Sequence, residues 1–382
     1  MTNDMVKRLK KHEFIVFAMD HYNPLGLVRS IGSMDKKVIV IAEKSKTDIS
    51  SYSKYSKEYI RVETVDDGYK VLMERFAGKF SEKPFLLTCD DKTIEFLDNR
   101  YDEWEDYFIG FNAGKLGQIT RYMDKFEILQ LAKKHGLKTL DTICVDKGIF
   151  PENLEYPIIT KSISPVVGGW KSDVHICNNE DELKSAYDKI RAPKVVIQKF
   201  IDKKNEYCID GFAAAKGTIM FNAIESRYNY LIPGYYSPYM TIQNFSMDEL
   251  KSGLEGMMCE VGFEGIYSVE FLIDQDDTYY FSEINFRNST WSYAATKAGM
   301  NLPVLWAETM LKGKLEKDPT KKIEDGFRAM VEPIDYGKRV TAGNTEWGEW
   351  LRDFREAKCP FYYNENDIEP FLYMCRNWEL LS

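Results

Sequence analysis

The sequence predicts an α/β domain with a parallel sheet, followed by a region of α+β type. In the first part of the chain, uninterrupted apolar strands alternate with helices, which is typical of a parallel sheet covered on both faces. Beyond about residue 120 the pattern changes to short strands and then to long, antiparallel-looking ones. The chain has 382 residues, which is longer than a chain that folds around a single hydrophobic core, so two or three domains are expected.

Residues 1–120 form the predicted α/β domain. Its first strand, FIVFAM, is followed by turn residues DHYNPLG, a short helix LVRSIGS and a second buried strand KKVIVIA. A helix near 66–80, the strand PFLLTCD and the helix KTIEFLDNRYDEW continue the pattern. The order of elements is Rossmann-like, but the first loop lacks GxGxxG, so no dinucleotide site is expected. That loop is either a plain strand-to-helix turn or part of a substrate site.

The later region opens with a helix near 117–135, closed by Gly136. Three short strands follow (KTLDTICV, YPIITKSI, WKSDVHIC), then the helix NEDELKSAYDKIRA and the strand VVIQKFI. The segment CIDGFAAAKGTIMFNAI predicts long antiparallel strands, and residues 301–312 predict a helix. The aromatic tail, 321–382, is interpreted as a C-terminal packing element without chemistry of its own.

Composition and charge exclude several classes of protein. Hydrophobic residues make up 44% and charged residues 29% of the chain, as in soluble globular proteins. A net charge of −9 argues against a nucleic-acid-binding surface, which needs clustered positive charge. The polar N-terminus lacks the apolar stretch of a signal peptide, and no membrane partner is expected. The seven cysteines contain no CxxC pair and are interpreted as reduced, mostly buried thiols of a cytoplasmic protein.

The most informative segment is SVEFLIDQDDTYYFSEINFR, residues 268–287. Two strands of alternating pattern flank Asp276 and Asp277. If these two residues form the turn, Glu270 lies opposite Glu283, and Asn285 shares the Glu283 face. The other face is then apolar and consists of Val269, Phe271, Ile273, Tyr280 and Ile284.

Two facing carboxylates repel each other unless one takes up a proton or a cation lies between them. Glu270, Glu283 and Asn285 offer hard oxygen ligands, which suit Mg²⁺. Arg287 lies two residues beyond Asn285, within reach of phosphates bound to such an ion. The alternative interpretation is a pair of solvated glutamates on an exposed hairpin.

The string VEF, followed after a hairpin by EINFR, resembles the metal-binding hairpin of the ATP-grasp superfamily. Upstream segments complete this resemblance in the expected order, over roughly residues 120–312. It implies a two-lobed ATP-grasp module, with an N-terminal lobe at 121–196 and a C-terminal lobe at 197–320. Residues 1–120 fit the smaller domain that precedes such modules, which commonly contributes to the acceptor site.

The resemblance also implies a nucleotide site. Lys125 stands at a helix start like the first ATP lysine of the superfamily, and Lys161 ends a strand like the second lysine, which reaches the α- and β-phosphates. Gly168 and Gly169 lie in a flexible loop suited to closing over phosphates, with Lys171 just beyond. No G-K-[ST] occurs, so a P-loop is excluded, and lysines, arginines and metal must offset the triphosphate charge.

The segment VVIQKFI resembles the hinge strand between the two lobes, whose backbone would meet the adenine edge. Its implied nucleotide-binding residues are Gln198, Lys199, Phe200 and Ile201. Glu206 resembles the carboxylate that accepts the ribose hydroxyls. Gln198 stands where an acidic residue is common, and the span to Glu206 is one residue longer than usual, so ATP over GTP rests on the resemblance alone.

The function implied by the resemblance is that of an ATP- and Mg²⁺-dependent carboxylate–amine ligase, with Mn²⁺ as an alternative metal. The γ-phosphoryl group would activate a carboxylate as an acyl phosphate, and an amine would then displace phosphate. Arg287 and Lys161 are the candidate catalytic residues, together with Arg227, which is otherwise a surface arginine. No GxSxG or HExxH motif offers a different chemistry.

Within the superfamily the sequence looks most like bacterial carboxylate–amine ligases of the D-aspartate ligase-like kind. Small-molecule carboxylates and amines would be its partners, and dimerisation is common in such enzymes. The substrate contacts that the resemblance suggests in the first domain are Arg29, Ser30, Asp90 and Asp91. Two alternatives stay open: a carboxylase-type enzyme that phosphorylates bicarbonate, and a non-catalytic ATP-binding relative.

Overall fold

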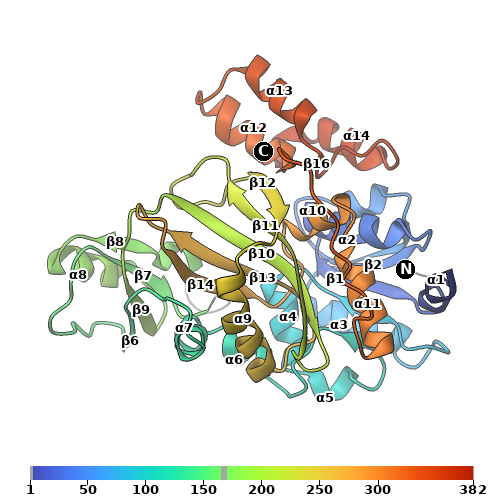
Figure 1. Ribbon diagram of the computed structural model, residues 1–382, viewed down its shortest axis with the longest axis horizontal. Coiled ribbons are helices and arrows are strands. Elements are labelled where there is room, and N and C mark those ends of the chain that lie inside the picture. The colour runs from blue at the N-terminus through green and yellow to red at the C-terminus, as the bar shows by residue number, and fades with distance from the viewer. Residues whose placement is uncertain (1–2, 165–169, 382) are drawn as a thin grey trace.

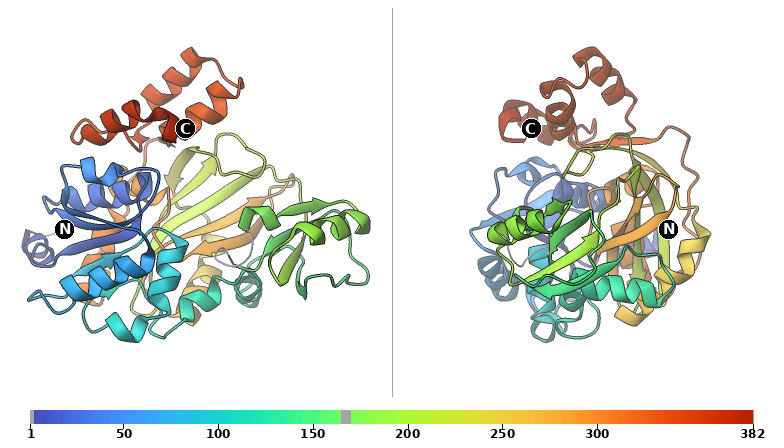
Figure 2. Two further views of the ribbon diagram at one scale, coloured as in Figure 1. Left: turned by 180° about the vertical axis from the view of Figure 1, so that it is seen from behind. Right: turned by 90° about the vertical axis from the view of Figure 1, so that its left-hand side faces the viewer.

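The computed structural model describes residues 3–164 and 170–381. Within these residues the chain forms three sheets, and the predicted combination of α/β and α+β architecture is confirmed. A parallel sheet near the N-terminus lies beside a long central sheet, and a small antiparallel sheet projects from the opposite end (Figure 1). The C-terminal helices lie together over one end of the central sheet and beside the N-terminal domain (Figures 1 and 2).

The N-terminal sheet has the strand order β3-β2-β1-β4-β5, and all of its neighbouring strands are parallel. Its strands are β1 (Phe14–Met19), β2 (Val38–Glu43), β3 (Ser56–Val62), β4 (Phe85–Leu87) and β5 (Ile109–Gly110). The helical elements of this domain are α1 (Asn3–Leu9), α2 (Tyr22–Gly32), η1 (Ile49–Tyr52), α3 (Val65–Phe76), α4 (Asp91–Asp98) and α5 (Tyr101–Trp104). Both faces of β1 are buried: Val16 packs in the core with α2, and Phe17 in the core with α3. The uninterrupted apolar pattern of the strand follows from this double burial.

Three predicted helices have different bounds in the structure. The segment DHYNPLG is not a turn, because α2 begins at Tyr22 and the side chain of His21 accepts a hydrogen bond from the Asn23 N–H. A proline is tolerated there because the first turn of a helix needs no backbone donor. The helix predicted over 117–135 is two helices, α6 (Gln118–Tyr122) and α7 (Lys125–Lys134), since Asp124 caps the second one. The segment KTIEFLDNRYDEW likewise divides into α4 and α5.

The small sheet has the order β6-β9-β7-β8 and antiparallel pairing. Its elements are β6 (Thr142–Asp146), β7 (Ile158–Ser162), η2 (Trp170–Asp173), β8 (His175–Cys177), α8 (Glu180–Lys189) and β9 (Lys194–Lys199). Helix α8 covers one face, where Leu183 packs with Ile158 and Ile197. The opposite face therefore remains for the polar side chains of β7 and β9.

The central sheet has the order β14-β13-β10-β11-β12-β15-β16. Its strands are β10 (Asn205–Ala214), β11 (Ile219–Tyr228), β12 (Tyr239–Asn244), β13 (Gly265–Ile273), β14 (Tyr279–Asn285), β15 (Arg328–Met330) and β16 (Cys359–Pro360). The accompanying helices are α9 (Asp248–Val261), α10 (Ser292–Lys297) and α11 (Leu302–Lys312). Helix α11 packs against β10 and β13 on one side and α2 on the other, so it joins the first domain to the central sheet. Trp306 of α11 is fully buried in this joint core.

The C-terminal segment contains α12 (Glu332–Tyr336), a π-helical turn (Gly337–Thr341), α13 (Trp347–Glu356), α14 (Glu369–Arg376) and α15 (Trp378–Leu381). The buried carboxylate of Glu332 accepts hydrogen bonds from the backbone N–H groups of Phe361, Tyr362 and Tyr363. Those bonds fix the chain that follows β16, the last strand of the central sheet.

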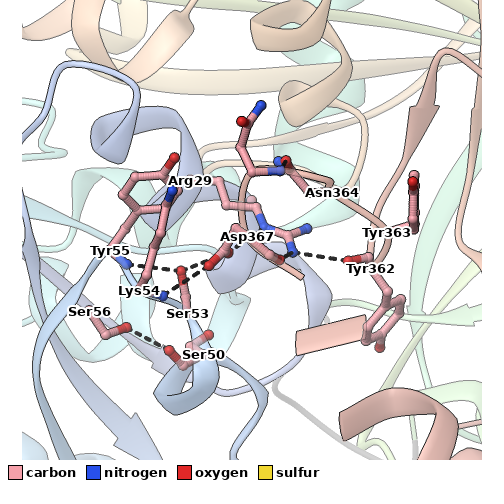
Figure 3. A network of polar contacts seen from close by, with 12 residues as sticks. Arg29, Ser50, Ser53, Lys54, Tyr55, Ser56, Tyr362, Tyr363, Asn364 and Asp367 are labelled. Carbon is pink, nitrogen blue, oxygen red and sulfur yellow. Dashed lines mark hydrogen bonds and ion pairs between the residues drawn. The ribbon is translucent and has the colours of Figure 1, made fainter. Parts of the chain in front are cut away.

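A buried polar network joins this segment to the first domain (Figure 3). Arg29 Nε donates to Asp367 Oδ2 at 2.8 Å, and its Nη1 and Nη2 donate to the carbonyl oxygens of Phe361 and Tyr362 at 2.6 and 2.9 Å. Asp367 also accepts from Ser53 Oγ at 2.8 Å. Arg29 is only 3% exposed, and Ser30 is buried against Thr296. Neither side chain is open to a substrate, contrary to the expectation from the sequence. Their role in the described structure is to hold elements together.

None of the helices in the described ranges is both long and apolar enough to span a bilayer. All seven cysteines are free thiols, but their burial varies more than the sequence predicts. Cys89, Cys177, Cys208 and Cys359 are buried, Cys144 is partly exposed, and Cys259 and Cys375 are exposed. Cys259 is exposed because it lies on the outer face of α9, whereas the nearby Met257, Met258 and Val261 are buried.

Candidate active site

The centre of the site is the hairpin of β13 and β14, where Glu270 pairs directly with Glu283 as predicted. The turn itself is longer than the expected two residues, because β13 ends at Ile273 and β14 begins at Tyr279. A register shift between Glu270 and Phe271 compensates for the longer turn. Phe281 therefore faces the core at 1% exposure, whereas the sequence placed Tyr280 there.

The two glutamates have opposite electrostatic environments. Burial and the charge of Glu283 raise the pKa of Glu270 well above its usual value. The charge of Lys125 lowers the pKa of Glu283, and Lys125 Nζ lies 2.8 Å from Glu283 Oε2. Asn285 Nδ2 donates to Glu270 Oε1 at 2.9 Å, so the amide lies beside the carboxylate pair. The two carboxylates therefore differ in how readily each one takes up a proton.

Two lysines approach the hairpin from the smaller lobe. Lys125 begins α7, where Asp124 accepts hydrogen bonds from the N–H groups of Phe126 and Glu127. Burial opposes the charge of Lys125, but Glu283 dominates and raises the pKa of that ammonium. Lys161, on β7, has its pKa lowered to about 8 by burial and by the neighbouring charge of Lys125. The pair therefore places beside the carboxylates one ammonium group with a raised pKa and one with a lowered pKa.

Gln198 holds Lys161 without neutralising it. In the register of β7 and β9, Ile159 pairs with Gln198 and Lys161 pairs with Val196, so these side chains share one face. Lys161 Nζ donates to Gln198 Oε1 at 2.9 Å, and Gln198 Nε2 donates to Thr142 Oγ1 at 2.9 Å. A carboxylate at this position would pair with the lysine charge, whereas the amide leaves that charge free for phosphate.

The hinge strand ends at Lys199, and two of its N–H groups are already bonded within the small lobe. Lys199 N–H donates to the Asp141 carbonyl at 2.9 Å, and Phe200 N–H donates to the Pro157 carbonyl at 3.0 Å. Of the groups predicted to meet adenine, the Lys199 carbonyl and the backbone of Ile201 remain candidates.

Glu206 stands on the same face of the central sheet as Glu270, because its neighbour Cys208 pairs with Glu270. The carboxylate of Glu206 forms an ion pair with Lys203. Both side chains line the cavity described below. The sequence reasoning missed Lys203; its spacing of three residues from Glu206 was the available signal.

Arg287 connects the hairpin to the first domain. Its Nε and Nη2 donate to the two carboxylate oxygens of Asp91 at 2.6 and 3.2 Å, and Nη2 also donates to Asn285 Oδ1 at 3.0 Å. Although burial opposes its charge, Asp91 raises the pKa of Arg287 further. The expected contribution of Asp91 to the site therefore has a structural basis. Asp90 instead caps α4, accepting from the N–H groups of Thr93 and Met19.

One predicted residue, Arg227, is turned away from the hairpin face of the sheet, and three others cannot be placed there. Arg227 pairs in register with Tyr207, on the face of the sheet opposite Glu206, and its Nη2 donates to Tyr279 Oη at 2.6 Å. Strand alternation, not distance along the chain, turns it away. Gly168 and Gly169 lie outside the described residues, as does the side chain of Lys171.

Most of these groups line a cavity of about 1530 Å³ between the first domain, the central sheet and the C-terminal segment. Lys161 and Gln198 are not among the described residues that line it. Its polar wall on the hairpin side comprises Asp91, Lys125, Lys203, Glu206, Glu270, Glu283, Asn285 and Arg287. A second group of lining residues comprises Asp20, His21, Tyr22, Lys44, Lys46, Tyr235, Tyr236, Trp291, Ile334, Gly337, Lys338, Thr341 and Tyr362. The sequence hinted at this second group through the loop DHYNPLG, which contains Asp20, His21 and Tyr22, and through the dense tyrosines of YNYLIPGYYSPYM.

Facing glutamates on a hairpin, two lysines from a smaller antiparallel lobe and a hinge strand between them define an ATP-grasp domain. Residues 124–312 match the family described as carbamoyl-phosphate synthase L chain, ATP binding domain. Residues 124–312 therefore form a domain of the ATP-grasp superfamily.

Solved structures with the same fold support this assignment. An N5-carboxyaminoimidazole synthetase from Staphylococcus aureus, complexed with ADP, has a TM-score of 0.63 at 18% identity, covering 89% of this chain and 87% of its own. An L-amino acid ligase from Bacillus licheniformis has a TM-score of 0.61 at 16% identity, with 79% and 74% covered. A biotin carboxylase from Campylobacter jejuni has a TM-score of 0.63 at 14% identity, with 86% and 75% covered. At these identities the likeness concerns the fold.

Proposed function

We propose that the protein is an ATP- and Mg²⁺-dependent ligase that joins a small-molecule carboxylate to an amine through an acyl phosphate. The observation that carries this proposal is the Glu270–Glu283 pair, which lies with Lys125 and Arg287 on the wall of one large cavity. A cytoplasmic location is part of the proposal and is supported by the free thiols of all seven cysteines.

The donor set fits a hard divalent cation. Glu270, Glu283 and Asn285 present carboxylate and amide oxygens, and burial together with the charge of Glu283 raises the pKa of Glu270, an effect that a bound cation would offset. Mg²⁺, or Mn²⁺, bound there would offset the negative charge of the β- and γ-phosphates. Asn285 Oδ1 now accepts from Arg287, so metal binding and release of Arg287 toward substrate would occur together.

The other residues would bind and orient the nucleotide. Lys125 and Lys161 would contact its phosphates, as would Gly168, Gly169 and Lys171. The backbone of the hinge strand, from Gln198 through Phe200 to Ile201, would face the adenine, and Glu206 would accept the ribose hydroxyls. The synthetase from Staphylococcus aureus is complexed with ADP, which supports a nucleotide as the ligand of this fold.

The proposed reaction has two steps. A carboxylate oxygen of the acid attacks the γ-phosphorus, and ADP leaves with the electrons of the broken P–O bond. The amine then attacks the acyl carbon, phosphate leaves, and the amine loses a proton. Arg287 would stabilise the negative charge that develops on the acyl phosphate, and the cavity walls would exclude water that could hydrolyse it.

The cavity favours an organic acid over bicarbonate. Bicarbonate, the acid of carboxylase-type relatives, is small, whereas this cavity of about 1530 Å³ continues to an aromatic wall that includes Tyr22, Tyr236 and Trp291. Large apolar and hydroxyl-bearing side chains are suited to the carbon skeleton of a larger acid or amine.

ADP release from ATP and Mg²⁺, measured against a panel of amino acids singly and in pairs, tests the proposal. We expect release that depends on a specific acid and amine. Glu283→Gln should abolish turnover and leave the unfolding temperature nearly unchanged, since it removes a charge at the cavity wall without changing shape. The control is Glu255→Gln, an exposed change on α9, which should turn over normally. Wild-type rates in Glu283→Gln would refute the site assignment.

A further inference from the structure

The second group of cavity-lining residues includes cationic side chains that form no ion pair within the described residues. Three lining cations of the hairpin side are paired: Lys125 with Glu283, Lys203 with Glu206, and Arg287 with Asp91. Lys44, on the other side, pairs with Glu63 at 2.7 Å. Across residues 3–164 and 170–381, no carboxylate lies within ion-pair distance of Lys46 or Lys338, and both line the cavity.

The acidic member of this group, Asp20, does not balance these charges. Asp20 is buried, accepts hydrogen bonds from Ser50 and Tyr59, and has its pKa raised to about 7 by burial. Its oxygens are therefore used internally, and its negative charge is partly lost near neutral pH. His21 does not add positive charge, because burial lowers its pKa to about 4. The charges of Lys46 and Lys338 are therefore not paired within the described residues, and an anion in the cavity would be attracted to them.

Lys338 is held in position by its surroundings. It lies in the π-helical turn Gly337–Thr341. Such turns are rare in proteins overall, and those that occur are often found at functional sites. Its neighbour Arg339 is paired, because its Nη2 donates to Asp353 Oδ2 at 2.6 Å. Lys338 Nζ lies 4.4 Å from the centroid of the Tyr235 ring, whose face supports the half-buried ammonium group.

The same position is fixed relative to the first domain. The ion pair of Arg29 and Asp367 joins the C-terminal segment to α2 (Figure 3). The Tyr22 and Tyr236 hydroxyls, 2.7 Å apart, join α2 to the loop that carries Tyr235. Lys338 is thus built into the cavity wall by elements on two sides, which distinguishes it from a free surface lysine.

We propose that Lys338, assisted by Lys46, binds a second anionic group of one of the two small-molecule substrates. This inference rests on the proposed ligase function and narrows its substrate class. That substrate is a dicarboxylic or phosphorylated amino acid or a close relative of one. One carboxylate reacts beside Arg287, and the other anionic group stays bound at Lys338. Specificity is therefore determined by residues outside the ATP-grasp domain of 124–312.

Binding to the full chain in the presence of Mg²⁺ and a non-hydrolysable ATP analogue tests this proposal. Isothermal titration would compare matched pairs in both enantiomers: aspartate with asparagine, glutamate with glutamine, and O-phosphoserine with serine. We expect the anionic member of at least one pair to bind tenfold or more tightly than its neutral partner. The carboxylate and phosphate pairs distinguish the two sources of negative charge.

Variants of Lys338 assign the preference to that side chain. Lys338→Ala should remove the preference, Lys338→Arg should keep most of it, and the exposed control Lys322→Ala should keep all of it. Thermal unfolding of each variant shows whether the fold persists. No preference for any anionic member, or an unchanged preference in Lys338→Ala, would overturn the proposal.

Failure of this inference is distinguishable from failure of the ligase proposal. Suppose that the wild type releases ADP with an acid and an amine that carry no anionic group besides the reacting carboxylate, and that Lys338→Ala does so equally. The anion subsite is then refuted and the ligase function stands. If binding depends on Lys338 but no substrate pair elicits ADP release, the subsite stands and the ligase proposal is refuted.

Discussion

Lys161 should make nucleotide binding depend on pH in a range where most lysines do not titrate. Its pKa is lowered to about 8 by burial and by the charge of Lys125, and the amide of Gln198 supplies no compensating charge. Bound phosphates would favour the charged ammonium and raise this pKa again. Binding of ATP should therefore be accompanied by proton uptake when the pH is near or above 8.

The magnitude follows from the size of the shift. At pH 7 about nine in ten Lys161 side chains are charged, and at pH 9 only about one in ten. The dissociation constant of a non-hydrolysable ATP analogue should hence rise about tenfold between pH 7 and pH 9. The lowered pKa also affects the free energy of unfolding. Burial of the charged ammonium group destabilises the fold below pH 8, and this cost decreases above pH 8, where the folded state releases the proton.

Titration calorimetry between pH 6.5 and pH 9.5, in buffers of different ionisation enthalpy, measures both the affinity and the proton uptake. Lys161→Arg keeps its charge over this range and should give a flatter profile. Lys161→Met should bind weakly at every pH. A wild-type profile as flat as that of Lys161→Arg, without proton uptake, would refute the argument from burial.

The remaining predictions concern stability and are measured by urea unfolding. Arg29→Met leaves the buried carboxylate of Asp367 unpaired, so it should cost about 3–5 kcal/mol, whereas Arg75→Met breaks an exposed pair and should cost less than about 1 kcal/mol. Equal losses of unfolding free energy in the two variants would show that the buried network stabilises the fold no more than an exposed ion pair does. Phe281→Ala should cost about 3–5 kcal/mol, and Tyr280→Ala distinctly less, because the register shift turns Phe281 into the core. The reverse order would contradict the observed register.

In the hairpin, the alternation of polar and apolar residues predicted the correct pair of glutamates from an incorrect turn length. Alternation predicted that Glu270 faces Glu283, and the structure confirms this pair. The prediction assumed a two-residue turn, but the real turn is longer and a bulge restores the register at the glutamates. The bulge has no signature in the alternation of polar and apolar residues, so the side of Tyr280 was predicted wrongly.

The lysines beside the hairpin were implied by the resemblance to a known family. The sequence pattern by itself determined the alternating strands and helices of the first domain, the long antiparallel strands of the central sheet and the facing glutamates of the hairpin. Those features depend on periodicity and spacing within short segments, where backbone geometry dictates which side chains share a face. Tertiary structure alone decided that Arg287 meets Asp91 across 196 residues and that Arg29 meets Asp367 across 338 residues. It also decided that Lys338 lines the cavity and that Arg227 does not. Such contacts depend on how separate elements pack, and no local pattern encodes which distant partner will fill a given position.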